Sequence, residues 1–138
     1  MKLYRSILFV PGNRPEWIDK APKYGPDALI LDLEDAVPND EKPEARSIVR
    51  AGIERSHKRG VPIVVRVNGL NTGLTGEDVE AVVTAGLVAI AIPKLEKVEE
   101  VLKVDAFHNT SGDNTWFLHS DGKGFIFFLL DLFSNQFS

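Results

Sequence analysis

The sequence predicts an α/β fold, in which short parallel strands alternate with helices. Four apolar runs carry this prediction: residues 5–11, 27–34, 62–68 and 87–94. Each run is short and nearly continuously apolar, which is typical of a strand buried on both faces of a parallel sheet. A polar turn and a helical pattern follow each run, so we expect four strand–helix units with right-handed crossovers.

The first two helical patterns differ in strength. The pattern over residues 15–24 contains Pro22, which should end or distort the helix. The pattern over residues 39–60 is the strongest in the chain. Asn39 is a suitable N-cap, acidic residues crowd the first turn, and basic residues precede Gly60.

The third and fourth patterns are shorter. Residues 75–86 begin with Thr75 and Asp78 at nearly the spacing of a capping box, and Gly86 is the predicted end of this helix. Residues 96–103 form the last pattern. Together these patterns complete the four predicted units.

The composition changes after Val104. Phe9 is the only one of the eight phenylalanines that lies before this point, and the segment that follows has neither a helical nor a strand period. We therefore divide the chain into residues 1–104, which hold the strand–helix units, and a divergent Phe-rich tail, residues 105–138. We interpret the tail as a departure in reading frame or splicing from a parent gene; the alternative is an atypical C-terminal lid.

The overall composition is that of a soluble globular protein, with 43% hydrophobic and 26% charged residues. A formal net charge of −4 disfavours broad binding to nucleic acid or to anionic membranes. The absence of cysteine excludes disulfides, thiolate catalysis and Cys-ligated zinc. The apolar run near the N-terminus is too short for a signal peptide, and residues 125–133 are too few to span a bilayer, so we expect a cytoplasmic protein.

Candidate catalytic and binding residues lie at the predicted carboxyl ends of the strands, where ligands bind in α/β sheets. These ends are residues 11–14, 32–36, 66–73 and 93–96, and all carry charge or glycine. Their position alone predicts that these residues form the rim of a pocket, although polar loops occur there in any α/β protein.

Arg66 is the most informative single residue, because a guanidinium inside an apolar run is costly to bury without a partner. Strand alternation puts Val64, Arg66 and Asn68 on one face, and Asp32 with Glu34 on one face of the preceding strand. One interpretation is a structural ion pair between Arg66 and these acids. The other is a planar receptor for a substrate carboxylate. Both can hold at once, if the acids position Arg66 and its outer edge meets the ligand.

Arg14 and Lys20 follow the predicted turn at Pro11 and Gly12. They are suited to hold the anionic end of a substrate, but composition alone favours solvated charges on a helix face. The histidines share no metal-ligand spacing, and the sequence contains no P-loop, dinucleotide-binding glycine motif or nucleophile elbow.

Four segments resemble, in order, motifs of the HpcH/HpaI aldolase and citrate lyase β-subunit family, which includes malyl-CoA and citramalyl-CoA lyases. They are residues 5–21, 27–46, 64–73 and 91–101. The resemblance covers about residues 4–104 and implies a TIM-type (β/α)₈ barrel, usually oligomeric. A barrel of this type takes about 250 residues, so we expect about the first four βα units plus the divergent tail.

The resemblance also implies an activity. Members of the family are Mg²⁺-dependent carbon–carbon lyases that cleave a 3-hydroxyacyl thioester to an acyl thioester and a 2-oxo acid. The thioester is carried by CoA or by a carrier protein. Matching motifs imply substrate or CoA contacts for Phe9, Arg14 and Lys20, and a catalytic, oxo-acid-binding role for Arg66.

By the same resemblance, Glu34 and Asp35 are carboxylates that support Arg66 or the water shell of the metal. The family's Mg²⁺ ligands, a Glu and an Asp, come from later strands, and no tail residue matches their motifs. We therefore expect no metal ligand in this chain and a truncated, impaired lyase. The alternative is a non-catalytic binding or scaffold subunit that keeps the Arg66 pocket and pairs with a fuller partner. A flavodoxin-like receiver domain is disfavoured, because its acids would follow the first strand.

Overall fold

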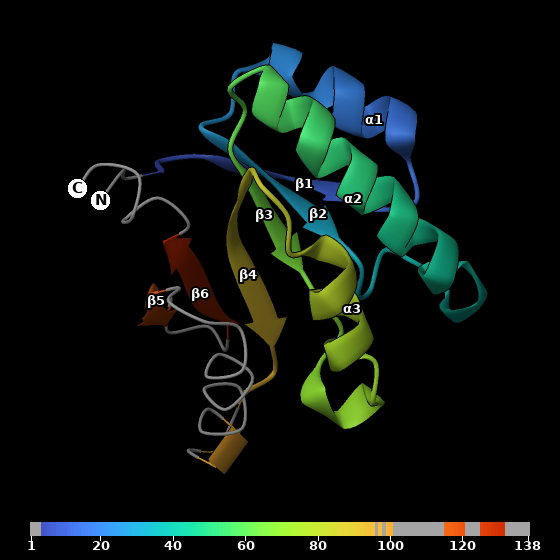
Figure 1. Cartoon of the computed structure of the whole chain (residues 1–138), viewed down its shortest axis with the longest axis vertical. Helices are drawn as coiled ribbons and strands as arrows, with labels where there is room; N and C mark the ends of the chain where they lie inside the picture. Colours follow the sequence, from blue (N-terminus) through green and yellow to red (C-terminus); the bar gives the residue numbers. More distant parts are fainter. Residues whose placement is uncertain (1–3, 96, 98, 101–114, 121–124, 132–138) are drawn as a thin grey trace.

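The structure is a computed structural model, which describes residues 4–95, 97, 99–100, 115–120 and 125–131 (Figure 1). Six strands form one sheet in the order β1-β2-β3-β4-β6-β5. Their bounds are β1 Ile7–Pro11, β2 Ala28–Asp32, β3 Ile63–Arg66, β4 Leu87–Pro93, β5 Thr115–Ser120 and β6 Phe125–Asp131.

The strands β1 to β4 are parallel neighbours, which confirms the predicted parallel α/β sheet. Each of these four strands lies inside one of the four apolar runs. β2 to β4 are almost entirely buried, as expected, whereas Ile7, Leu8 and Phe9 of β1 are exposed because β1 lies at the edge of the sheet. In the described residues β1 and β5 are the edges of the sheet, and closure into a barrel remains a prediction.

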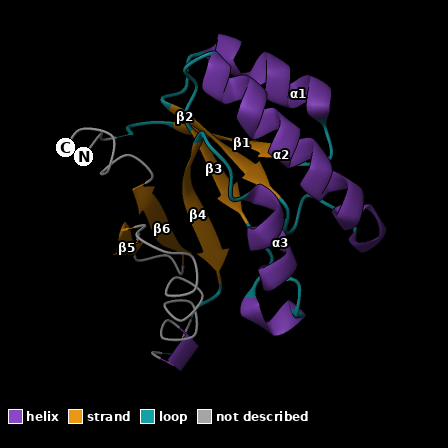
Figure 2. Ribbon diagram, in the orientation of Figure 1, coloured by secondary structure: helices purple, strands orange, loops and turns teal. Residues whose placement is uncertain are grey.

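Three α-helices cover one face of the parallel strands (Figure 2). They are α1 (Pro15–Lys20), α2 (Lys42–Lys58) and α3 (Thr75–Val82), with 3₁₀ turns η1 (Ala21–Tyr24), η2 (Asn39–Glu41) and η3 (Leu70–Thr72). The main core fills the space between these helices and the sheet, and it includes Leu29, Leu31, Val49, Ile53, Ile63, Val65 and Ile90. A smaller cluster is formed by alternate residues of the strands, Ile30, Val64, Ala89 and Ala91.

Proline residues lie at one end of each of the first two helices: Pro22 follows α1, and Pro43 is in the first turn of α2. The α-helix ends at Lys20 and a 3₁₀ turn containing Pro22 follows, which confirms the predicted distortion. The prediction that Asn39 caps the second helix is wrong. Asn39 begins the η2 turn, and α2 starts after Glu41, since the fixed φ angle of Pro43 suits the first turn of the helix.

The third helix differs from its prediction at both ends. Thr75 and Asp78 form no capping box, because the Thr75 hydroxyl donates to the carbonyl of Asn68 (2.8 Å) and the Asp78 carboxylate is bonded elsewhere. The helix ends at Val82, before the predicted Gly86. The predicted helix over residues 96–103 lies mostly outside the described residues.

Two strands, β5 and β6, lie in the segment for which the sequence predicted neither a helix nor a strand. β6 pairs antiparallel with β4, and β5 pairs antiparallel with β6. The aromatic and branched residues of β6 favour strands, but its apolar residues do not alternate with polar ones, so no period of two marks it. Whether the tail departs from a parent gene stays a prediction.

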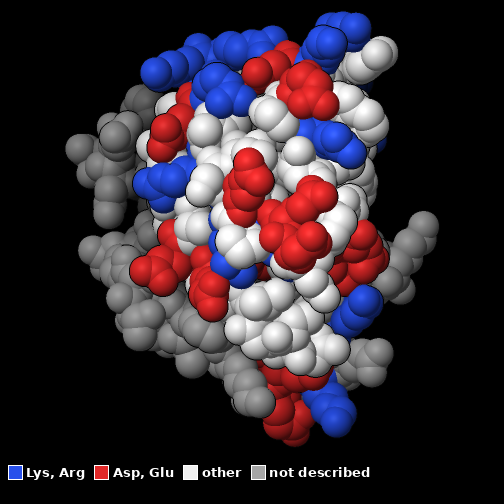
Figure 3. Space-filling model, turned by 90° about the vertical axis from the view of Figure 1, so that its right-hand side faces the viewer, with Lys and Arg blue, Asp and Glu red and all other residues white. Residues whose placement is uncertain are grey.

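Charged side chains of both signs are interspersed over the face that carries the helices (Figure 3). Basic residues gather where α2 ends, with Arg55, His57 and Lys58 in its last turn, where they complement the helix dipole. None of the helices in the described ranges is long and apolar enough to cross a membrane.

Gly12 provides a test of how the end of β1 packs against β2. Its N–H donates to the carbonyl of Asp32 (2.8 Å), and a Cβ there would lie 2.6 Å from that oxygen and 2.8 Å from Val49 Cγ2. We expect Gly12→Ala to lower the free energy of unfolding by roughly 2 kcal/mol through overpacking, measured by urea denaturation. The control Gly76→Ala lies in α3 with open space around it, so it should be neutral or slightly stabilising. Equal effects of the two substitutions would contradict this packing.

Candidate functional site

Arg66 and Asp32 form a bidentate ion pair at the carboxyl ends of neighbouring strands. Arg66 Nε donates to Asp32 Oδ1 (2.8 Å) and Nη2 donates to Oδ2 (2.7 Å). The two residues are register partners of β3 and β2, and their side chains are 13% and 3% exposed. The guanidinium carbon lies 5.2 Å from the centre of the Phe9 ring. The ion pair that one interpretation of the sequence expected is therefore present.

The Asp32 carboxylate is further held by the chain that follows it. The backbone N–H groups of Glu34 and Ala36 donate to its two oxygens, at 2.9 and 3.0 Å. Burial by itself would raise the pKa of Asp32, but the hydrogen bonds from Arg66 and from these two N–H groups outweigh it, so the pKa lies below its usual value. The hydrogen bond with Asp32 raises the pKa of Arg66. Both groups are thus charged at neutral pH.

Glu34 lies between two cations. Its Oε1 is 3.0 Å from Lys94 Nζ and its Oε2 is 3.4 Å from Arg66 Nε. The Glu34 side chain is only 8% exposed, and within the described part of the chain Oε2 accepts no hydrogen bond. The hydrogen bond to Glu34, followed by the charges of Glu34 and Asp35, raises the pKa of Lys94. Charges of alternating sign therefore run across the strand ends.

A buried lysine supports this row from the helix side. Lys42, in the first turn of α2, donates from Nζ to the carbonyls of Leu33 (2.7 Å) and Glu34 (2.8 Å) and to Asn68 Oδ1 (2.7 Å). Burial lowers the pKa of Lys42, against the opposing effect of nearby carboxylates, of which Asp78 acts most strongly. The ammonium ties the chain after β2 to the chain after β3.

Asp78 extends the buried network into α3. This side chain is fully buried and accepts from Asn68 N (2.8 Å), Asn68 Nδ2 (2.6 Å) and Arg46 Nε (2.7 Å). Arg46 also contacts Glu77, at 2.7 Å. Asp78 therefore joins α2 and α3 to the end of β3.

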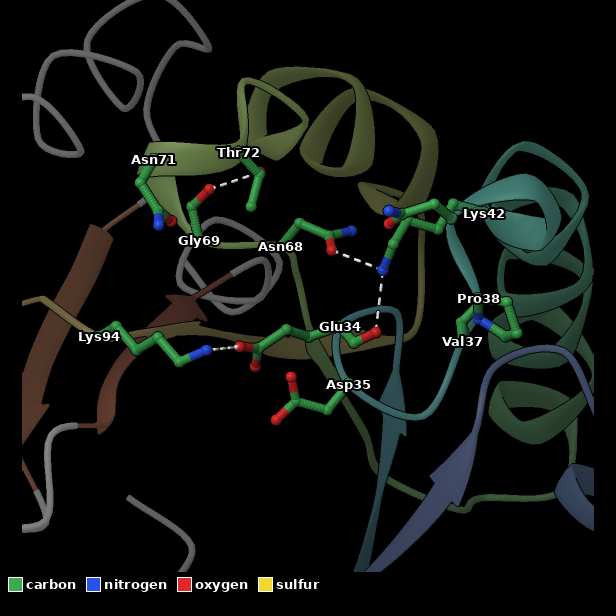
Figure 4. Close-up of a pocket in the computed structure, with 11 residues that line it drawn as sticks. Glu34, Asp35, Val37, Pro38, Lys42, Asn68, Gly69, Asn71, Thr72 and Lys94 are labelled. Atoms are coloured by element: carbon green, nitrogen blue, oxygen red, sulfur yellow. Dashed lines mark hydrogen bonds and ion pairs between the residues drawn. The ribbon is translucent and has the colours of Figure 1, made fainter.

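A polar pocket of about 370 Å³ opens beside these groups (Figure 4). Its walls come from the segments that follow β2, β3 and β4. The lining residues are Glu34, Asp35, Val37, Pro38, Asn39, Lys42, Asn68, Gly69, Asn71, Thr72 and Lys94.

The structure brings some of the predicted site residues together. The Arg66 guanidinium lies against Phe9 and forms an ion pair with Glu34. Asp35 is exposed and lines the pocket, and it acts on Arg66 through its charge.

Two predicted cations lie apart from this group. Lys20 lines a separate, more apolar hollow of about 320 Å³ that Phe9, Trp17 and Tyr24 also line. Arg14 is exposed in the turn before α1. Phe9 therefore borders both the hollow and the Arg66 site.

The predicted shared face of Val64, Arg66 and Asn68 is wrong for Asn68. β3 ends at Arg66, so the alternation stops there, and the Asn68 side chain bonds to Lys42 and Asp78 on the helix side. The sequence also missed Lys42 and Asp78, whose positions in helices carry no distinguishing signal. Lys94 could have been predicted, since it is the charged residue that ends the apolar run over residues 87–94.

Carboxylates and histidines are the possible metal ligands in the described residues. Among them, no three His, Cys, Asp or Glu side chains come together in an arrangement that could hold a metal ion. Asp32 and Glu34, the carboxylates nearest to Arg66, are engaged by Arg66 and Lys94.

The fold and the site together define an α/β protein with a polar, charge-paired site at the carboxyl ends of parallel strands. The chain belongs to the HpcH/HpaI aldolase/citrate lyase family, whose sequence model matches residues 5–115. The resemblance inferred from the four motifs is thereby confirmed.

Relatives agree with this assignment. Citrate lyase subunit beta of Leuconostoc mesenteroides subsp. cremoris is 40% identical over 95 residues, 69% of this chain and 32% of that protein. A (3S)-malyl-CoA thioesterase of Cereibacter sphaeroides is 38% identical over 103 residues, 75% of this chain and 36% of that protein. The chain thus spans about a third of the length of the curated relatives it matches.

Solved structures that are similar to this chain contain ligands. Citrate lyase beta subunit from M. tuberculosis, complexed with oxaloacetate and magnesium, superposes with a TM-score of 0.59 and 34% identity, over 71% of this chain and 42% of that one. A further M. tuberculosis structure holds magnesium, acetoacetate and coenzyme A, with a TM-score of 0.58 and 35% identity over 74% of this chain and 38% of that one.

Arg46 has two acidic partners that differ in burial, which permits a matched test. Asp78 and Glu77 both lie 2.7 Å from Arg46, but their side chains are 0% and 66% exposed. We expect Asp78→Asn to lower the free energy of unfolding by about 3 kcal/mol, because it removes the buried carboxylate and leaves the mostly buried guanidinium with only its exposed partner, Glu77. Glu77→Gln should cost less than about 1 kcal/mol. Urea denaturation measures both values, and similar losses would show that burial does not set the strength of these pairs.

The lowered pKa of Asp32 predicts that the stability of the fold depends on pH. Because its pKa is lower in the folded state, ionised Asp32 stabilises the fold above its unfolded pKa of about 4, and this contribution is lost as the pH falls through the folded value. We expect Asp32→Asn to be less stable than the parent at pH 7, with a difference that shrinks below about pH 4. Urea denaturation across this range tests it, with the more exposed Asp19 as the site of a control substitution to Asn. A difference independent of pH would contradict the ion pair.

Proposed function

We propose that this chain provides the oxo-acid-binding side of a carbon–carbon lyase of the citrate lyase β or malyl-CoA lyase type. The reaction cleaves a 3-hydroxyacyl thioester to an acyl thioester, on CoA or a carrier protein, and a 2-oxo acid. The observation that carries the proposal is the position of Arg66, which is ion-paired and held against Phe9 at the strand ends. The oxaloacetate and magnesium in the related M. tuberculosis structure support the ligand class.

Arg66 is proposed as the catalytic residue that binds the oxo-acid carboxylate and stabilises negative charge that develops beside it. Asp32 engages two of its nitrogens, so the cation is positioned before the ligand arrives and reorganises little during reaction. Glu34 and Asp35 are proposed as the carboxylates that keep Arg66 charged and in place.

The thioester is proposed to bind along Phe9, Arg14 and Lys20. The hollow lined by Phe9 and Lys20 combines aromatic surface with a cation at its border, which suits a ligand that joins a flat base to anionic phosphates, as CoA does. The coenzyme A in the related M. tuberculosis structure supports this ligand class.

Mg²⁺, when bound, supplies a Lewis acid that polarises the oxygens of the oxo acid. Among the described residues, no three metal-ligating side chains come together. We propose that the metal ligands lie outside these residues and that this chain alone has reduced or no lyase activity. We further propose that the protein acts in the cytoplasm as a homo-oligomer or together with a fuller subunit.

An exposed apolar strip favours a second candidate, a non-catalytic binding subunit. Five large apolar side chains of β1, α1 and η1 are exposed: Ile7 by 39%, Leu8 by 36%, Phe9 by 51%, Trp17 by 54% and Tyr24 by 73%. Exposed apolar side chains on and beside an edge strand are typical of association surfaces.

Substrate turnover and ligand binding test the two candidates together. The purified chain is incubated with malyl-, citramalyl- and citryl-CoA in the presence of Mg²⁺, and oxaloacetate binding is measured by calorimetry. We expect little turnover, and a loss of oxaloacetate affinity of at least about tenfold in Arg66→Gln, with Arg50→Gln on the exposed face of α2 as the matched control.

Each result has a distinct meaning. Robust turnover would show that the chain is a complete lyase and would exclude the binding subunit. Oxaloacetate binding that depends on Arg66 without turnover supports the role of Arg66 and is expected both of a lyase with reduced activity and of a binding subunit. Binding that does not change in Arg66→Gln would contradict the role of Arg66 in both candidates.

A further inference from the structure

Lys94 has an unusual backbone. It follows Pro93, the last residue of β4, and has a φ angle of 57°, so it is the one non-glycine residue with a positive φ in the described ranges. A side chain that is not glycine adopts this left-handed conformation at an energetic cost, and such residues cluster at functional sites. The backbone conformation therefore indicates that Lys94 is a candidate functional residue.

The Lys94 ammonium is anchored and accessible at once. Its Nζ lies 3.0 Å from Glu34 Oε1, yet the Lys94 side chain is 65% exposed whereas that of Glu34 is 8% exposed. Figure 4 shows the side chain extending along the pocket toward Glu34. An ammonium has three N–H donors, so one contact with Glu34 leaves donors for a ligand without breaking the ion pair.

Lys94 and Arg66 contact opposite oxygens of the same carboxylate. Arg66 Nε is 3.4 Å from Glu34 Oε2, and Lys94 Nζ is 3.0 Å from Oε1. The two cations are therefore separated by no more than these contacts and the width of one carboxylate. A small molecule with two anionic groups can span that separation.

The two cations differ in freedom. Arg66 is held by both oxygens of Asp32 and is 13% exposed, so it offers a fixed position. Lys94 is a compact cation on a long exposed stem, which adjusts to the length of the ligand. A fixed and an adjustable cation are suited to the two ends of a diacid.

We propose that Lys94 determines substrate specificity by binding the second carboxylate of a dicarboxylic 2-oxo acid while Arg66 binds the first. The inference rests on the proposed function of Arg66 and deepens it by selecting dicarboxylic over monocarboxylic oxo acids. Three nearby carboxylates, Asp32, Glu34 and Asp35, offset the local positive charge. Recognition therefore depends on directed hydrogen bonds rather than on a strong positive field.

The test compares oxaloacetate with pyruvate, which lacks the second carboxylate. Calorimetry of the full chain in the presence of Mg²⁺ gives both affinities for the parent protein, Lys94→Gln and Lys94→Arg. We expect Lys94→Gln to bind oxaloacetate about tenfold more weakly and pyruvate less than about twofold more weakly, and Lys94→Arg to retain the preference. Lys58→Gln, at the exposed C-terminal end of α2, is the matched control.

The outcomes separate this inference from the proposed function. Equal losses for the two ligands, or none, would overturn the role of Lys94 and leave that of Arg66 intact. A parent protein that binds neither ligand overturns both proposals. If Lys94→Gln does not fold, NMR titration of the parent protein decides instead: a Lys94 side-chain resonance that shifts with oxaloacetate and not with pyruvate supports the inference, and equal shifts overturn it.

Discussion

The arrangement of the strand ends depends on the buried ammonium of Lys42. It extends from α2 to the carbonyls of Leu33 and Glu34 after β2, and to the side chain of Asn68 after β3. A buried ammonium with an unmade hydrogen bond is costly, so these three acceptors must stay together. Asp78 then bonds the same Asn68 from α3. Lys42 thus joins α2 to the segments that follow β2 and β3, and Asn68 extends this connection to α3 through Asp78.

The candidate site lies on this support as a row of alternating charges. Asp32, Arg66, Glu34 and Lys94 each contact a neighbour of opposite sign. Because each charge is compensated locally, the row holds its geometry without creating a strong net field. A ligand is then recognised by the positions of donors, which the β-sheet and the Lys42 contacts keep in place. The row also explains why acids and bases occur together immediately after buried strands.

The sequence predicted those features that depend on local chemistry. Each parallel strand lies in a nearly continuous apolar run, so the strands were found, although β1 is exposed at the edge of the sheet. A guanidinium inside such a run is costly to bury without a partner, so an ion pair with nearby acids was one of the two interpretations of Arg66. The buried contacts of Lys42 and Asp78 were not foreseen, because partners from separate helices are selected by tertiary packing. The position of Asn68 was wrong because the end of a strand depends on its neighbours.

Two lysines next to the same glutamate differ in chemical accessibility. Lys42 is 5% exposed and donates three hydrogen bonds, whereas the side chain of Lys94 is 65% exposed. A reagent that acylates amines must approach the nitrogen, so it will reach Lys94 and be excluded from Lys42. Covalent modification of lysines would therefore label the mouth of the pocket and spare the scaffold beneath it. Access, more than basicity, distinguishes the two amines.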